Sequence, residues 1–145
     1  MDSNYKRTQL TSKANLLANQ LLLENATWKR TLEFIIEEDV NFKIRLSEIL
    51  KNIYQPDDIT LEKIEHLYNR LLKGNEALAL IRGEVSDIER QLGRDFCEQP
   101  DRLKGIQEKQ KELRKNMETA ELEFHKLKFD FSNYISEILE LNQQT

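Results

Sequence analysis

Two histidines, His66 and His125, are the side chains best suited to metal or acid–base chemistry. A di-iron site inside a helical bundle requires a glutamate three residues before its histidine, so that both ligands point inward. Lys63 and Leu122 occupy those positions. A glutamate instead precedes each histidine by four residues, which is typical of exposed pairs on one helix face. We therefore predict no metal site at either histidine.

Asp39 is the acidic residue with the most unusual position, because it lies between Ile35 and Phe42 in a helical apolar pattern. A buried carboxylate requires a partner or a raised pKa. It could bind a ligand, but a single polar residue in an apolar helix seam more often fixes the register of the helices. Gln110 has the same kind of position in a later segment, and we interpret it in the same way.

No group of residues in the sequence forms a catalytic set. A nucleophile, a base and an orienting group are not brought together by any motif. The four glycines are dispersed, so no glycine-rich phosphate loop is present. We expect a non-enzymatic protein without a cofactor.

The composition limits the classes of partner. The chain has 145 residues, 33% charged and 39% apolar, with a net charge of -4. A negative chain without a basic cluster argues against general nucleic-acid binding. The first residues are too polar for a signal peptide or a membrane span, and the single cysteine, Cys97, permits no intramolecular disulfide. We expect a cytoplasmic protein that binds neither nucleic acid nor membranes.

The strongest pattern is the recurrence of apolar residues at alternating steps of three and four. This spacing keeps one stripe of a helix, here called the seam, against its neighbours, as in coiled coils. The seam positions of the later two segments are Ile64, Leu67, Leu71, Gly74, Leu78, Ile81, Val85, Ile88 and Leu92, and then Leu103, Ile106, Gln110, Leu113, Met117, Ala120, Phe124, Leu127, Phe131, Tyr134, Ile138 and Leu141.

The first segment is less regular. A seam from Trp28 to Ile53 and another from Leu10 to Leu21 are joined through an extra step of four around Glu24 and Asn25. Such an insertion locally unwinds a supercoil or marks a break. We predict a continuous, kinked helix, with the alternative of four helices if the first breaks near Asn25.

Turn and capping residues give the helix boundaries. We predict helices over about 8–54, 61–96 and 101–142, separated near Pro56 and Pro100. Thr60 is the expected N-cap of the second helix, with Ile59 and Ile64 at the spacing of a hydrophobic staple. That helix ends at Gly93 if this glycine is left-handed, and otherwise at 96 or 97.

These elements predict an all-α, elongated, antiparallel up-down-up three-helix bundle with coiled-coil-like packing, forming a single domain over 1–145. In this arrangement Asp39, Gly74 and Phe124 fall in roughly one layer. The space at Gly74 either admits the ring of Phe124 or forms an interior pocket.

Several apolar residues lie outside the seam and form a candidate partner surface: Phe34, Leu80, Leu122, Phe129 and Leu139. We expect a protein–protein interaction module, such as a scaffold, an adaptor or a small chaperone-like binder, that binds another protein or forms a homodimer. The alternative is a ligand-binding or sensory bundle with its pocket near Asp39, Gly74 and Phe124.

Overall fold

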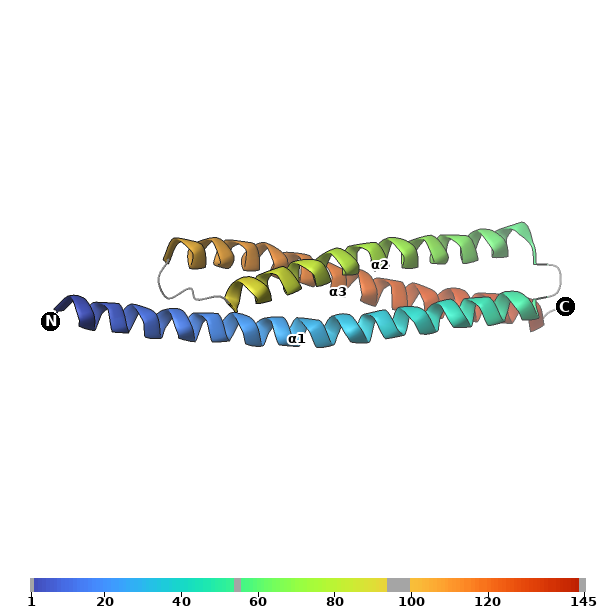
Figure 1. The fold of residues 1–145 in the computed structure, drawn as a ribbon. Helices are drawn as coiled ribbons and strands as arrows, with labels where there is room; N and C mark the ends of the chain where they lie inside the picture. Colours follow the sequence, from blue (N-terminus) through green and yellow to red (C-terminus); the bar gives the residue numbers. More distant parts are fainter. Residues whose placement is uncertain (1, 54–55, 94–99, 144–145) are drawn as a thin grey trace. The chain divides into compact units, whose positions relative to one another are not determined.

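The computed structural model contains three helices, α1 (Asp2–Asn52), α2 (Asp58–Leu92) and α3 (Pro100–Gln143) (Figure 1). It describes residues 2–53, 56–93 and 100–143, and side chains within 13–53, 56–93 and 101–140. No strand occurs in these ranges. The predicted all-α three-helix bundle is confirmed.

Helix α1 is continuous over 51 residues. Asn25 lies inside it and is fully buried, so the four-helix alternative with a break near Asn25 is wrong. The helix also begins at Asp2 rather than at residue 8 and ends at Asn52 rather than at 54. Leu21, Asn25 and Trp28 are all buried, so the seam passes through Asn25 without a break.

The start of α2 is capped by Asp57. The backbone N–H of Thr60 donates to Asp57 Oδ1 at 2.7 Å, and the N–H of Leu61 donates to the Asp57 carbonyl at 3.1 Å. The side chain of Asp57 therefore accepts from the Thr60 amide, which has no partner within the helix, and the backbone carbonyl of Asp57 accepts the first bond of the helix. The prediction of Thr60 as the N-cap is wrong, since α2 begins at Asp58. The Ile59 staple is also wrong, because Ile59 is 62% exposed.

Helix α2 ends at Leu92, four residues before the longer predicted end at 96. The N–H of Gly93 donates to the carbonyl of Glu89 at 2.9 Å, and Gly93 does not adopt the left-handed conformation proposed for it. Cys97 lies outside the described residues. Helix α3 begins with Pro100 and has Asp101 in its first turn, as predicted.

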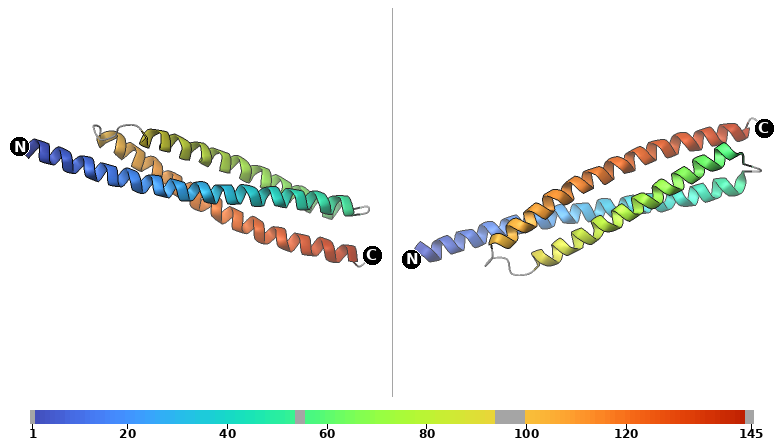
Figure 2. Two further views of the ribbon diagram at one scale, coloured as in Figure 1. Left: turned by 60° about the horizontal axis from the view of Figure 1, so that its bottom comes forward. Right: turned by 90° about the horizontal axis from the view of Figure 1, so that it is seen from above.

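The residues group into two compact units. Unit 1 comprises Met1–Leu32 and Leu80–Met117, and unit 2 comprises Glu33–Ala79 and Glu118–Thr145. Each helix is an unbroken ribbon and contributes one stretch to each unit (Figure 2). The single domain over 1–145 stays a prediction.

Polar contacts in unit 2 establish that α2 and α3 run antiparallel. Lys63 Nζ donates to Glu137 Oε2 at 2.6 Å, and Arg70 Nη1 donates to Asp130 Oδ2 at 2.6 Å. The residue numbers rise along α2 as they fall along α3. The cation is contributed by α2 in both pairs, which are seven residues apart and therefore on one helix face.

Helix α1 runs antiparallel to α2 and parallel to α3 in the same unit. The hydroxyl groups of Ser47 and Tyr68 hydrogen-bond at 3.0 Å. The ring centroids of Phe42 and Phe131 are 4.5 Å apart, and those of Phe34 and Phe124 are 6.1 Å apart. Unit 2 therefore has the predicted up-down-up order.

Most of the core is built from the predicted seam, but Ile135, which lies outside that seam, is also buried. Every seam residue of α2 except Gly74 is buried, as are most of those of α3. Ala120 and Tyr134 are only half-buried, and the side chain of Leu141 lies outside the described residues. Transfer of such apolar side chains from water is the main force that favours folding.

We predict that Asp57→Ala lowers the melting temperature, because the α2 N-terminus loses its capping acceptor. The hydrogen bond to Thr60 also lowers the pKa of Asp57. Its contribution to stability is therefore present above the ordinary aspartate pKa and is lost as the pH falls through the lowered value. Thermal unfolding followed by circular dichroism at pH 7 tests this, with Asp58→Ala as the control. Equal melting temperatures for Asp57→Ala and the unmodified protein would contradict it.

Candidate functional site

A buried polar pair joins α1 and α3 in unit 1. Asn25 and Gln110 are both fully buried, and Gln110 Nε2 donates to Asn25 Oδ1 at 2.7 Å. Asn25 Nδ2 and Gln110 Oε1 have no hydrogen-bond partner. Gln110 was predicted as a polar seam residue, but Asn25 was missed. The signal for it was available, since Asn25 lies four residues after Leu21 and three before Trp28.

Glu24 and Arg114 extend this pair toward the surface. Arg114 donates to both carboxylate oxygens of Glu24, from Nε at 3.1 Å and from Nη2 at 2.7 Å, and Gln110 Nε2 donates to Glu24 Oε1 at 2.9 Å. Burial acts to raise the pKa of Glu24, but the hydrogen bonds from Arg114 and Gln110 outweigh it and lower the pKa. The cluster links α1 to α3 in unit 1 through side-chain hydrogen bonds.

Asp39 is buried in unit 2, as predicted, with 2% of its surface exposed. When the Asn75 amide is oriented with its nitrogen toward Asp39, it donates to Asp39 Oδ2 at 3.0 Å and accepts from Lys43 Nζ at 2.6 Å. Asp39 Oδ1 has no partner. Burial raises the pKa of Asp39 to about 6, although the nearby Lys43 ammonium opposes the rise.

Gly74 and Phe124 do not form the packed pair considered from the sequence. A Cβ atom at Gly74 would meet no other atom within 4 Å, so the ring of Phe124 does not fill the space beside this glycine. Phe124 instead packs against Phe42, with ring centroids 6.4 Å apart, and against Phe34. Asp39 contacts Asn75, the neighbour of Gly74 in the sequence.

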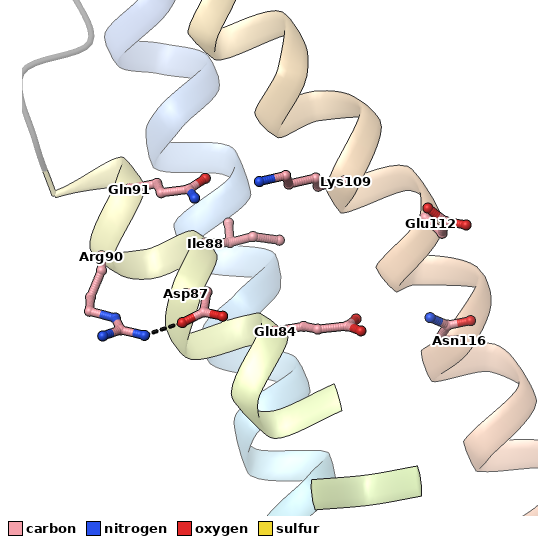
Figure 3. A pocket seen from close by; sticks show the side chains of 8 residues that line it. All are labelled: Glu84, Asp87, Ile88, Arg90, Gln91, Lys109, Glu112 and Asn116. Atoms are coloured by element: carbon pink, nitrogen blue, oxygen red, sulfur yellow. Dashed lines mark hydrogen bonds and ion pairs between the residues drawn. The ribbon is translucent and has the colours of Figure 1, made fainter. Parts of the chain in front are cut away.

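A depression of about 730 Å³ lies between α2 and α3 in unit 1 (Figure 3). Glu84 and Gln91 of α2 point toward Lys109 and Asn116 of α3. Glu84 and Gln91 continue the seven-residue repeat of Lys63 and Arg70 in α2, but among the described residues Glu84 forms no ion pair with α3, and Gln91 is neutral. The lining has mixed charge, and Ile88 is its apolar residue. These side chains form no catalytic set.

A second depression of about 440 Å³ lies between α1 and α3 in unit 1. Glu24, Gln110 and Arg114 contribute to its lining. Neither depression is lined by Asp39, Gly74 or Phe124. The interior pocket considered from the sequence therefore does not correspond to either of them.

Both histidines are exposed, and the part of the chain described by the structure contains no cluster of three or more His, Cys, Asp or Glu residues suited to a metal ion. The same part contains no helix long and apolar enough to cross a membrane. His125 lies beside Phe124, with ring centroids 5.6 Å apart.

The five residues of the candidate partner surface are all exposed. Phe129 is 68% exposed, Leu122 55% and Phe34 51%, and Leu139 is 47% exposed. These four belong to unit 2. Leu80 is 70% exposed but belongs to unit 1, so it is not part of the surface in unit 2.

Comparison with known proteins adds no further constraint. No protein-family model, curated protein or solved structure matches the chain.

We predict that Asp39→Asn is more stable than the unmodified protein at pH 7.5 by about 1–3 kcal/mol, because it removes a buried charge. The raised pKa means that folding favours the protonated form of Asp39. The contribution of Asp39 to stability is therefore greatest below the ordinary aspartate pKa and is lost as the pH rises through about 6. The difference between the two proteins should shrink toward pH 4.

Urea unfolding between pH 4 and 7.5 measures this difference. Glu37→Gln, an exposed substitution on the same helix, is the control and should show no comparable trend. A stability difference between Asp39→Asn and the unmodified protein that is independent of pH would contradict the prediction.

We predict that Gly74→Ala raises the free energy of unfolding by roughly 0.5–1 kcal/mol, because alanine favours the helix and its methyl group has room. Gly83→Ala, at another α2 glycine whose Cβ would meet no atom within 4 Å, provides a matched reference. Urea unfolding tests both variants. Destabilisation by Gly74→Ala alone would show that the structure requires a glycine at that position.

Proposed function

We propose that the protein is a non-enzymatic helical module that binds another protein through the outer face of α3 in unit 2. The observation that carries this proposal is the exposure of Phe129 and Leu122, which lie seven residues apart on one face of α3. Single exposed apolar residues are common. Two large ones seven residues apart place apolar side chains two turns apart on one side of the helix, which is a candidate contact surface.

A further exposed aromatic ring, that of Phe34, lies near the same stretch of α3. Phe34 of α1 contacts the ring of Phe124 edge-on, and His125 contacts the same ring. Phe34 is half-exposed even though it makes this contact. Burial of one Leu or Phe side chain contributes roughly 1.5–3 kcal/mol, so a partner that covers Phe34, Leu122 and Phe129 gains a sizeable apolar contribution.

The core of the bundle also supports this assignment. The seam uses a three–four spacing in all three helices, and such coiled-coil-like helices can add a further helix through a second apolar strip. Three of the four buried polar residues that the structure describes, Asn25, Asp39 and Gln110, form hydrogen bonds between helices.

Photo-crosslinking tests the proposed function. We expect a benzophenone amino acid at position 129 to form a discrete protein adduct in cells that express the protein. The same group at Glu76, an exposed residue of α2 in unit 2, should not form this adduct. Leu122→Asp should remove the adduct at position 129 while leaving the helical circular dichroism unchanged. Identical labelling from positions 129 and 76 would contradict the proposal.

A further inference from the structure

The outer face of α3 carries a second stripe with the same three–four spacing as the core seam. All six of its residues are exposed, and none carries a permanent charge, although a third of the chain is charged. Uncharged residues at this spacing, between charged flanks, are typical of a helix that packs lengthwise on another helix. We call these six residues the outer stripe: Leu122, His125, Phe129, Ser132, Ser136 and Leu139.

We propose that the outer stripe binds the outer stripe of a second copy of this chain, with the two α3 helices antiparallel. This inference rests on the proposed function and identifies the partner. In an antiparallel helix pair, each layer joins the first apolar position of one heptad to the second apolar position of the other. The outer stripe then pairs Leu122 with Leu139 of the second copy, His125 with its Ser136, and Phe129 with its Ser132.

Side-chain size supports a second copy in this register. Each large aromatic residue, His125 or Phe129, meets a small serine, and the two leucines meet at both ends. The sizes of the facing side chains are therefore complementary when two outer stripes pack in antiparallel orientation. Such self-complementarity is what a two-fold symmetric interface requires.

The competing registers are less favourable. A shift by one heptad in one direction pairs His125 with Phe129 and places Leu139 opposite Lys115. A shift in the other direction pairs Ser132 with Ser136 and places His125 opposite Gln143. Only the proposed register pairs all six residues of the outer stripe with residues of the outer stripe.

The surroundings of the stripe are compatible with this register. Lys126, at the flank, lies opposite Asn133 of the second copy, so no like charges face one another there.

An exchange of side chains across the interface tests the register. We expect sedimentation equilibrium of the full chain to give twice the 17.2 kDa chain mass. Phe129→Ser should weaken self-association by at least about tenfold, as expected for loss of a central aromatic residue. Adding Ser132→Phe should restore it, because Phe at 132 then faces Ser at 129. Adding Ser136→Phe instead is the matched control and should not restore it.

Three outcomes would overturn the inference. These are a monomer at every concentration, self-association that Phe129→Ser does not weaken, and failure of the Phe129→Ser/Ser132→Phe exchange to restore association. A monomer that still forms the adduct at position 129 would overturn the second copy as partner and leave the proposed function standing. An adduct at position 129 that has only the mass of two copies of this chain, with dimerisation and rescue intact, would support self-association as the sole use of this surface.

Discussion

The structure depends on one constraint, which is that each helix must bury a single stripe of residues spaced three and four apart. An α-helix that keeps this spacing presents the same face to its neighbours along its length. The constraint decides which side chains are buried, such as Leu71 and Phe131. It equally decides which apolar side chains are left outside, and Phe129 is the most exposed of the phenylalanines that the structure describes.

We expect the polar residues within the seam to give these helices a defined register. An apolar seam alone tolerates sliding by a heptad, because every layer resembles the next. The Asn25–Gln110 pair and the Asp39–Asn75 contact each require a particular alignment, since a shifted helix would leave buried polar groups without partners. These contacts leave the buried atoms Asn25 Nδ2 and Asp39 Oδ1 without a hydrogen-bond partner. A buried polar atom without a partner lowers the stability of the fold.

Much of the fold could be predicted from the sequence, because burial follows the three–four spacing directly. Asn25 was missed because it is polar, although the steps from Leu17 through Leu21 and Asn25 to Trp28 span eleven residues, a repeat that a continuous helix accommodates. Local capping was less predictable. Asp57 and Thr60 are both good N-cap residues, and only the path of the backbone distinguishes them.

The candidate site was only partly predictable for a different reason. The exposure of Leu122 and Phe129 follows from their positions opposite the seam. The contacts of Phe124 with Phe34 and Phe42, and the open space beside Gly74, depend on side-chain rotamers and on the separation of the helices. The identity of a partner depends on the surface of the partner as well as on that of this chain. The sequence of this chain describes the partner's surface only when the partner is a second copy of the chain.

The central claim is that the seam side chains are buried and the outer-stripe side chains are exposed to solvent. Fluorine NMR of protein labelled at phenylalanine tests this claim most directly, by comparing the resonances in H₂O and D₂O at low protein concentration. The account predicts a solvent isotope shift for Phe129 and Phe34, which are 68% and 51% exposed. It predicts little or no shift for Phe42, Phe124 and Phe131, which are buried. A solvent-shielded Phe129 in the dilute monomer, or a solvent-accessible Phe131, would contradict the assignment of the seam and of the outer stripe.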